Sequence, residues 1–132
     1  MIEEYRFGLI KVSGETYTHD VEVRWFPESS SGSDSAGFGL EVLPWWRKES
    51  HLIDSIDIQR ALTQRPDILI IGTGMYGMAK ITGKAQEEIR IRGVKLIIDK
   101  TEEAVKAFNV IKAKIEEEGE KKKIIGLFHL TC

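Results

Sequence analysis

The amino-acid sequence predicts an α/β protein, with one three-layer domain spanning residues 1–132. Three short apolar runs in the second half, at 67–71, 94–98 and 124–130, alternate with segments of helical period. This order is typical of a β-α-β-α-β unit in which right-handed crossovers join parallel strands and the helices pack on the sheet. The runs are apolar on both faces, as expected for a sheet that is covered on each side.

The N-terminal part predicts a β-hairpin or meander attached to that unit. Residues 5–12 and 16–25 are rich in β-branched and aromatic residues, and they alternate with a period of two around a turn at Ser13-Gly14. Residues 27–37, PESSSGSDSAG, contain nothing that could bury a large apolar area, so we expect a flexible loop there. Residues 38–44 predict a further strand, which a proline ends.

Helix start signals place the remaining elements. Asp54 can cap a helix over 55–65, and Thr82 can cap a short helix that ends near Gly93. Thr101 can cap a long helix, because two glutamates follow it in the first turn, where the helix dipole favours negative charge.

The composition excludes several classes of protein. The net charge of −2 offers no electrostatic footprint for nucleic acid, and we interpret Lys121 to Lys123 as a solvated turn. No apolar run approaches the ~18 residues that span a bilayer. With Cys132 as the one cysteine no intrachain disulfide can form, which favours a reducing cytoplasm. Abundant Glu and Lys with scarce Asn and Gln are typical of a thermophile.

A glycine motif follows the strand 67–71. Gly72, Gly74 and Gly77 form G-x-G-x-x-G, the dinucleotide-binding fingerprint, and Asp99 ends the next strand. In that fingerprint the helix begins inside the glycine motif, whereas here the best helix start is Thr82, several residues later. A tight turn is therefore the favoured interpretation, and no cofactor is predicted.

The carboxyl ends of the three predicted parallel strands indicate where a ligand-binding site would lie. If the strands are parallel, these ends lie on one edge of the sheet, where ligands of open α/β sheets bind. Backbone N–H groups of the Gly72–Gly74 turn and the start of the helix at Thr101 could hold a small anion there. The alternative is that Thr101 is only a cap and Asp99 only a turn former. The candidate ligand-binding residues are Gly72, Thr73, Gly74, Asp99, Thr101 and His129.

The remaining reactive and aromatic side chains yield one further candidate group. His129 and Cys132 could suggest a metal, but zinc requires about four ligands and the remaining histidines, His19 and His51, are not at ligand spacing, so no metal is predicted. Trp45 and Trp46 cannot both face one core if the chain is extended, and an exposed aromatic often marks a protein contact. Trp45, Trp46 and His51 are the candidates for such a contact, and the alternative is that both rings pack under the helix 55–65.

The sequence resembles the Mth938-like family of small domains. The resemblance rests on PDILIIGTG, GVKLIIDKTEEAVKAFNVIKAKIEEEG and the terminal LFHLTC, with PWWRKESH, Gly8, Gly14, Tyr17 and Asp20 upstream. It implies a compact three-layer α/β domain with a GTG turn and no established enzymatic reaction. Animal relatives include a mitochondrial assembly factor for respiratory complex I and a protein linked to fat-cell differentiation. Where relatives usually carry Glu-Gly-Arg, this chain has Glu118-Gly119-Glu120, so a role that rests on that arginine is in doubt.

The expected function is a non-enzymatic binding or assembly module that acts through a protein partner, with a small anion-binding pocket at the GTG turn. The alternative is a small-molecule enzyme or carrier for a nucleotide or an organic acid. It would use the edge formed by Gly72–Gly74, Asp99 and His129. A homodimer is left open, and the sequence names neither partner nor ligand.

Overall fold

The computed structural model describes residues 1–27, 39–49 and 51–132. The loop predicted at 27–37 lies, apart from Pro27, outside the described residues. In chain order the elements are β1 (Ile2–Arg6), β2 (Leu9–Val12), β3 (Glu15–Tyr17), β4 (Val21–Phe26), β5 (Gly39–Pro44), β6 (Leu52–Ile53), α1 (Ser55–Thr63), β7 (Ile68–Thr73), β8 (Lys80–Ile81), α2 (Gly83–Ile91), β9 (Lys95–Asp99), α3 (Thr101–Glu118) and β10 (Ile124–His129).

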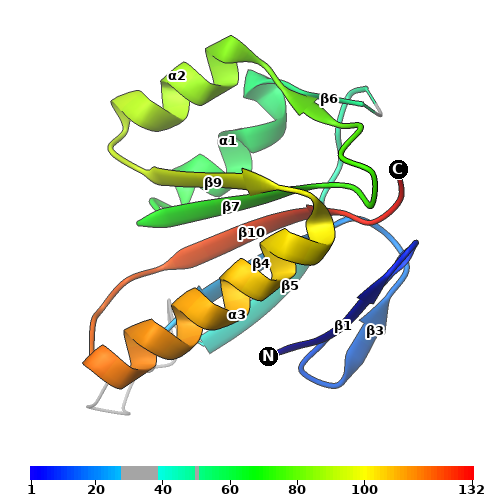
Figure 1. Cartoon of the computed structure of the whole chain (residues 1–132). Helices are drawn as coiled ribbons and strands as arrows, with labels where there is room; N and C mark the ends of the chain where they lie inside the picture. The colour runs from blue at the N-terminus through cyan, green and yellow to red at the C-terminus, as the bar shows by residue number, and fades with distance from the viewer. Residues whose placement is uncertain (28–38, 50) are drawn as a thin grey trace.

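A five-stranded sheet in the order β5-β4-β10-β7-β9 forms the middle layer. β10 lies at its centre, antiparallel to β4 and parallel to β7, and β7 is in turn parallel to β9. The α/β class and the three parallel strands of the second half are therefore confirmed. α1 and α2 cover one face, and α3 and the N-terminal strands cover the other (Figure 1).

Every residue of β7 and β10 is buried, because each of these strands lies between two apolar layers. On the α3 side, Phe108 packs edge-on against Phe128, with the ring centroids 6.0 Å apart. On the other side, Leu69 and Ile71 join the buried residues of α1 and α2. The two cores hold the strand ends in fixed positions.

The N-terminal half differs from the predicted hairpin. β1, β2 and β3 form a small antiparallel sheet of their own, and β4 joins the main sheet. Gly8, with φ +77°, allows the chain to turn inside the expected strand 5–12. The predicted turn at Ser13-Gly14 is present, with positive φ at both residues. The strand expected at 16–25 is divided after Tyr17, because β4 buries its apolar face against β10 and α3.

The opposite side of β4 carries a charge that is not solvated. Glu22 is 1% exposed, and its carboxylate is paired with Arg24 at 2.6 Å and with Arg60 of α1 at 3.0 Å. A buried carboxylate needs such partners, because its desolvation is unfavourable. Glu22, a polar residue of the alternating pattern, thus joins β4 to α1 through Arg60.

Two of the three helix starts follow the sequence signals. Asp54 forms a capping box at α1, and the Thr82 hydroxyl accepts the Ala85 N–H at the start of α2. The prediction that Thr101 caps α3 is wrong. The cap position is Lys100, and Thr101 is the first helical residue, with a hydroxyl that bonds to the strand ends instead.

A two-stranded parallel sheet between β6 and β8 was not predicted. Each strand has two residues, too few to show a period in the sequence. None of the helices in the described part of the chain is both long and apolar enough to span a bilayer.

Candidate functional site

The ends of β7, β9 and β10 meet at one edge of the main sheet. Gly72 of β7 pairs with Asp99 of β9, and Thr73 pairs with His129 of β10. The Thr73 hydroxyl also donates a hydrogen bond to the Asp99 carbonyl at 3.1 Å. The strand register therefore brings Gly72, Thr73, Asp99 and His129 together, as expected from parallel strands.

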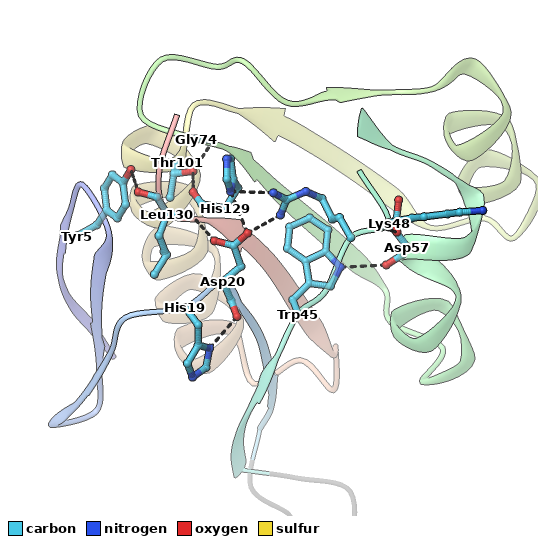
Figure 2. A network of polar contacts seen from close by, with 11 residues as sticks. Tyr5, His19, Asp20, Trp45, Lys48, Asp57, Gly74, Thr101, His129 and Leu130 are labelled. Atoms are coloured by element: carbon cyan, nitrogen blue, oxygen red, sulfur yellow. Dashed lines mark hydrogen bonds and ion pairs between the residues drawn. The ribbon is translucent and has the colours of Figure 1, made fainter. Parts of the chain in front are cut away.

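Thr101 joins the three strand ends to one another. It is 0% exposed, and its Oγ1 accepts the Gly74 N–H at 2.8 Å and donates to the His129 carbonyl at 2.6 Å. Its own N–H donates to the Gly74 carbonyl at 3.1 Å. Figure 2 shows this hydroxyl between the turn and β10. One buried side chain thus satisfies polar groups of two separate segments.

Residues at the end of the chain close the GTG turn. The Met75 N–H donates to the Thr131 carbonyl at 2.8 Å, and the Met78 N–H donates to the Cys132 carbonyl at 3.1 Å. Gly74 has φ +101°, and a Cβ there would lie 2.6 Å from the Cys132 carbonyl oxygen. Glycine is thus required for conformation and for space. The N–H groups of Gly74, Met75 and Met78 bind acceptors of the chain itself.

The glycine motif also lacks the helix that dinucleotide binding needs. β8 lies between the turn and α2, and α2 begins only at Gly83. The helix that follows the glycine motif in sequence therefore does not begin inside it, whereas a pyrophosphate is held by the free N–H groups of a helix that does.

A partly buried cluster of Asp20, Arg47 and His129 lies beside the strand ends, and Figure 2 shows Asp20 next to His129. The Asp20 Oδ2 lies 2.9 Å from His129 Nδ1 and is ion-paired with the Arg47 guanidinium, and Oδ1 accepts the Leu130 N–H at 2.8 Å. Burial acts to raise the pKa of Asp20, but the hydrogen bonds from His129, Arg47 and Leu130 outweigh it and lower the pKa.

The imidazole of His129 is held by one of its two nitrogens. Arg47 Nη2 lies 3.0 Å from the same Nδ1 that faces Asp20. The carboxylate can only accept and the guanidinium can only donate, so a proton on Nδ1 fits the Asp20 contact and a lone pair on Nδ1 fits the Arg47 contact. The other nitrogen, Nε2, is buried and has no hydrogen-bond partner among the described residues.

Sequence reasoning missed the roles of Arg47 and Tyr5 at this site. The Tyr5 hydroxyl donates to the Leu130 carbonyl at 2.9 Å, which ties the N-terminal sheet to the end of β10. Desolvation, with the nearby Asp20 charge, raises the pKa of Tyr5 to about 12. Asp20 and His129 are 109 residues apart, so no local motif could have joined them.

Cys132 lies beside His51 rather than beside His129. Its Sγ is 3.7 Å from His51 Nε2, and both side chains lie near the GTG turn, since the Lys80 N–H after it donates to the His51 carbonyl at 2.9 Å. Within the parts of the chain that the structure describes, no three His, Cys, Asp or Glu side chains are grouped to hold a metal ion.

The two tryptophans have opposite environments. Trp45 is 3% exposed, its Nε1–H donates to the Asp57 carbonyl at 2.9 Å, and the Arg47 guanidinium lies 5.0 Å from its ring centroid. The ring is enclosed, so Trp45 cannot provide the contact surface that the sequence nominated. Trp46 is 72% exposed.

Further apolar side chains are exposed near the closed turn. Phe7, Tyr76 and Met78 are each at least half exposed, and the rings of Phe7 and Tyr76 lie 6.5 Å apart. Phe7 comes from the N-terminal sheet, and the other two come from the segment after β7. The sequence placed Phe7 inside the strand expected over 5–12, and Tyr76 and Met78 in the segment after the glycine turn.

Comparisons with known proteins agree with this fold. The profile of a family described as "Protein of unknown function (DUF498/DUF598)" matches residues 2–118. The conserved hypothetical protein PH1505 from Pyrococcus horikoshii OT3 is 27% identical, with a TM-score of 0.69 over 100% of this chain and 99% of that chain.

Two more distant structures share the fold. MT938 is 22% identical, with a TM-score of 0.67 over 100% of this chain and 98% of its own. A protein described as an outer membrane protein from Bartonella henselae is 16% identical, with a TM-score of 0.68 over 99% of this chain and 94% of its own. Since the family profile covers most of the sequence, this chain belongs to the DUF498/DUF598 family, the Mth938-like proteins.

Proposed function

We propose that this protein is a non-enzymatic binding module that holds a protein partner at the surface around Trp46. The supporting observation is the 72% exposure of Trp46 next to a tryptophan that is anchored in the core. Large aromatic side chains dominate the binding energy of many interfaces, because they bury much area with few rotatable bonds.

The backbone around Trp46 is held on both sides. The Trp45 N–H donates to the Asp20 carbonyl at 2.9 Å, and the Lys48 N–H donates to the Asp57 carboxylate at 3.0 Å. Arg47 is ion-paired with Asp20. A side chain on a fixed backbone loses less conformational entropy on binding, so this rigidity favours a contact role.

The polar groups at the strand ends support binding rather than catalysis. The N–H groups of the GTG turn and the Thr101 hydroxyl are bonded within the chain. Asp20 is committed to His129, Arg47 and Leu130. A catalytic group needs a partner in the substrate, whereas these groups have structural partners.

Site-specific crosslinking tests this proposal. We would place the photoreactive residue p-benzoylphenylalanine at position 46 and irradiate the protein in a native lysate of its source. A matched control carries it at position 110 on α3, because Val110 is 67% exposed and Trp46 is 72% exposed. A defined adduct should form from position 46, and unlabelled protein should compete with it more strongly than Trp46→Ala does. Equal crosslinking from both positions, or none from position 46, would contradict the proposal.

A small anionic ligand, such as a nucleotide or an organic acid, is the second candidate. His129 Nε2 is buried and lacks a partner among the described residues, and the Arg47 guanidinium lies beside the same ring. Arginine binds carboxylate and phosphate groups through paired hydrogen bonds. In this alternative Gly72, Thr73, Gly74, Asp99 and Thr101 position His129 by the contacts described above.

A thermal-shift screen of nucleotides and organic acids tests the second candidate. A ligand at roughly 100 times its Kd should stabilise the fold by about 2.7 kcal/mol, and His129→Gln should reduce that shift while Trp46→Ala leaves it unchanged. If saturating concentrations do not raise the melting temperature, the candidate fails.

A cytoplasmic location stays a prediction from composition.

A further inference from the structure

β9 is an edge of the main sheet with a regular, unprotected backbone. Among the described residues it pairs only with β7, over five successive residue pairs from Lys95 to Asp99 (Figure 1). Proteins usually protect such edges with charged side chains, prolines or bulges. β9 has a charge at each end, Lys95 and Asp99, but neither a proline nor an irregularity of register.

The outward-facing backbone groups of β9 can be identified from its pairing with β7. The Lys95 N–H donates to the Asp67 carbonyl at 3.1 Å and therefore faces the sheet. Directions alternate along a strand, so Ile97 and Asp99 share this orientation. Leu96 and Ile98 turn their N–H and C=O groups away from β7, toward the open side.

These groups match a second, antiparallel copy of the same strand. When a two-fold axis passes through Ile97, Leu96 of one copy lies opposite Ile98 of the other. Each such pair then exchanges two N–H···O=C bonds, which gives four bonds in total. A shift by one residue would place inward-facing groups at the contact and lose these bonds.

The side chains are complementary in the same register. Lys95 of one copy lies opposite Asp99 of the other, so the dimer contains two opposite-charge pairs; both residues are exposed. Ile98 is exposed and lies opposite Leu96 of the other copy. The sequence Lys-Leu-Ile-Ile-Asp has a positive charge at one end and a negative charge at the other. When two copies pair antiparallel, each positive end therefore lies opposite a negative end.

We propose that β9 is a dimerisation edge, at which two copies of this chain pair antiparallel and extend the two five-stranded sheets into one. The contact is isologous, as expected for a two-fold dimer. α2 adds a groove of about 460 Å³ beside the edge, lined by residues that include Ile89, Val94 and Leu96. The inference is independent of the contact proposed at Trp46.

Charge reversal at the two ends of β9 tests this register. Sedimentation velocity on the isolated protein, from about 1 to about 500 μM, should show a dimer with a Kd in the micromolar range, as suits a small interface. Lys95→Glu places Glu against Asp99, and Asp99→Lys places Lys against Lys95, twice in each dimer. Each single change should raise the Kd about tenfold, and the double variant should restore it. Lys106→Glu is the control, since it reverses an exposed charge on α3 and leaves β9 unchanged.

Ile98→Pro tests the backbone contribution. It removes an N–H that faces away from β7, so the ladder inside the protein is kept while two of the four bonds between copies are lost and the proline ring stands toward the partner strand. This variant should be monomeric, with a folded circular-dichroism spectrum. If the wild type is monomeric over the whole range, the proposal is overturned, and an extended segment of another protein becomes the occupant to seek. A dimer whose Kd neither charge reversal changes, or that the double variant does not restore, also overturns it.

Discussion

Replacing Thr101 with valine tests whether this hydroxyl joins the strand ends. Valine has nearly the same shape as threonine but cannot form hydrogen bonds. Thr101 is 0% exposed, accepts the Gly74 N–H at 2.8 Å and donates to the His129 carbonyl at 2.6 Å. Both backbone groups would lose this partner in a place that water does not reach.

The expected destabilisation follows from these two contacts. A buried donor left unpaired costs about 1–3 kcal/mol, and the weakened carbonyl adds a smaller amount, so Thr101→Val should lower the unfolding free energy by about 3 kcal/mol. For a domain of this size that corresponds to a Tm lower by about 10 °C. Thr101→Ser keeps the hydroxyl and removes one buried methyl group, which costs about 1 kcal/mol.

Urea unfolding followed by circular dichroism measures both variants against the wild type. The comparison isolates the hydroxyl, because the valine variant loses it and keeps the methyl group, while the serine variant does the reverse. If Thr101→Val proves as stable as Thr101→Ser, the bridge contributes little and the reasoning about the strand ends is refuted.

Three further predictions concern the same region. Gly74→Ala should destabilise the protein by more than about 2 kcal/mol, because it combines positive φ with contacts below 3 Å; Gly119→Ala, which has positive φ and open space, should cost about 1 kcal/mol in the same urea assay. Asp20 has a lowered pKa, so its stabilising effect is present above pH ~4 and is lost as the pH falls. The stability difference between the wild type and Asp20→Asn should therefore shrink from pH 7 to pH 3; a constant difference would argue against the ion pair. Tyr5, with a pKa of about 12, should stabilise the fold below pH ~10 and lose this effect as the pH rises toward 12. Absorbance of the phenolate should show a late titration step that Tyr5→Phe removes; three tyrosines that titrate together near pH 10 would contradict it.

Local patterns predicted the second half of the fold well. The runs at 67–71, 94–98 and 124–130 became β7, β9 and β10 within two residues at each end, because continuous apolar strands are the signature of a covered parallel sheet. The caps at Asp54 and Thr82 were found because a cap bonds to residues within one turn. The predicted hairpin around Ser13-Gly14 is present as β2 and β3, but its strands are shorter than expected, because the interruptions in both predicted strands do not disturb the alternation of the side chains.

The candidate site was predictable only in its outline. Parallel strands place their ends on one edge, so Gly72, Thr73, Asp99 and His129 could be grouped from topology alone. The partners of these groups could not be found in this way. Thr101 carries the signature of a cap, and only the packed structure shows that its hydroxyl bonds to segments 27 and 28 residues away.

The central position of β10 has a consequence for how the protein is made. Among the described residues, β4 and β5 join the rest of the sheet only through β10, and β7 and β9 lie on its other side. A ribosome synthesises these four neighbours first, so a nascent chain holds two unconnected strand pairs until residues 124–129 emerge. Long-range strand pairing of this kind slows folding. During translation the exposed flanks of β4 and β7 are thus the surfaces that a chaperone would need to shield.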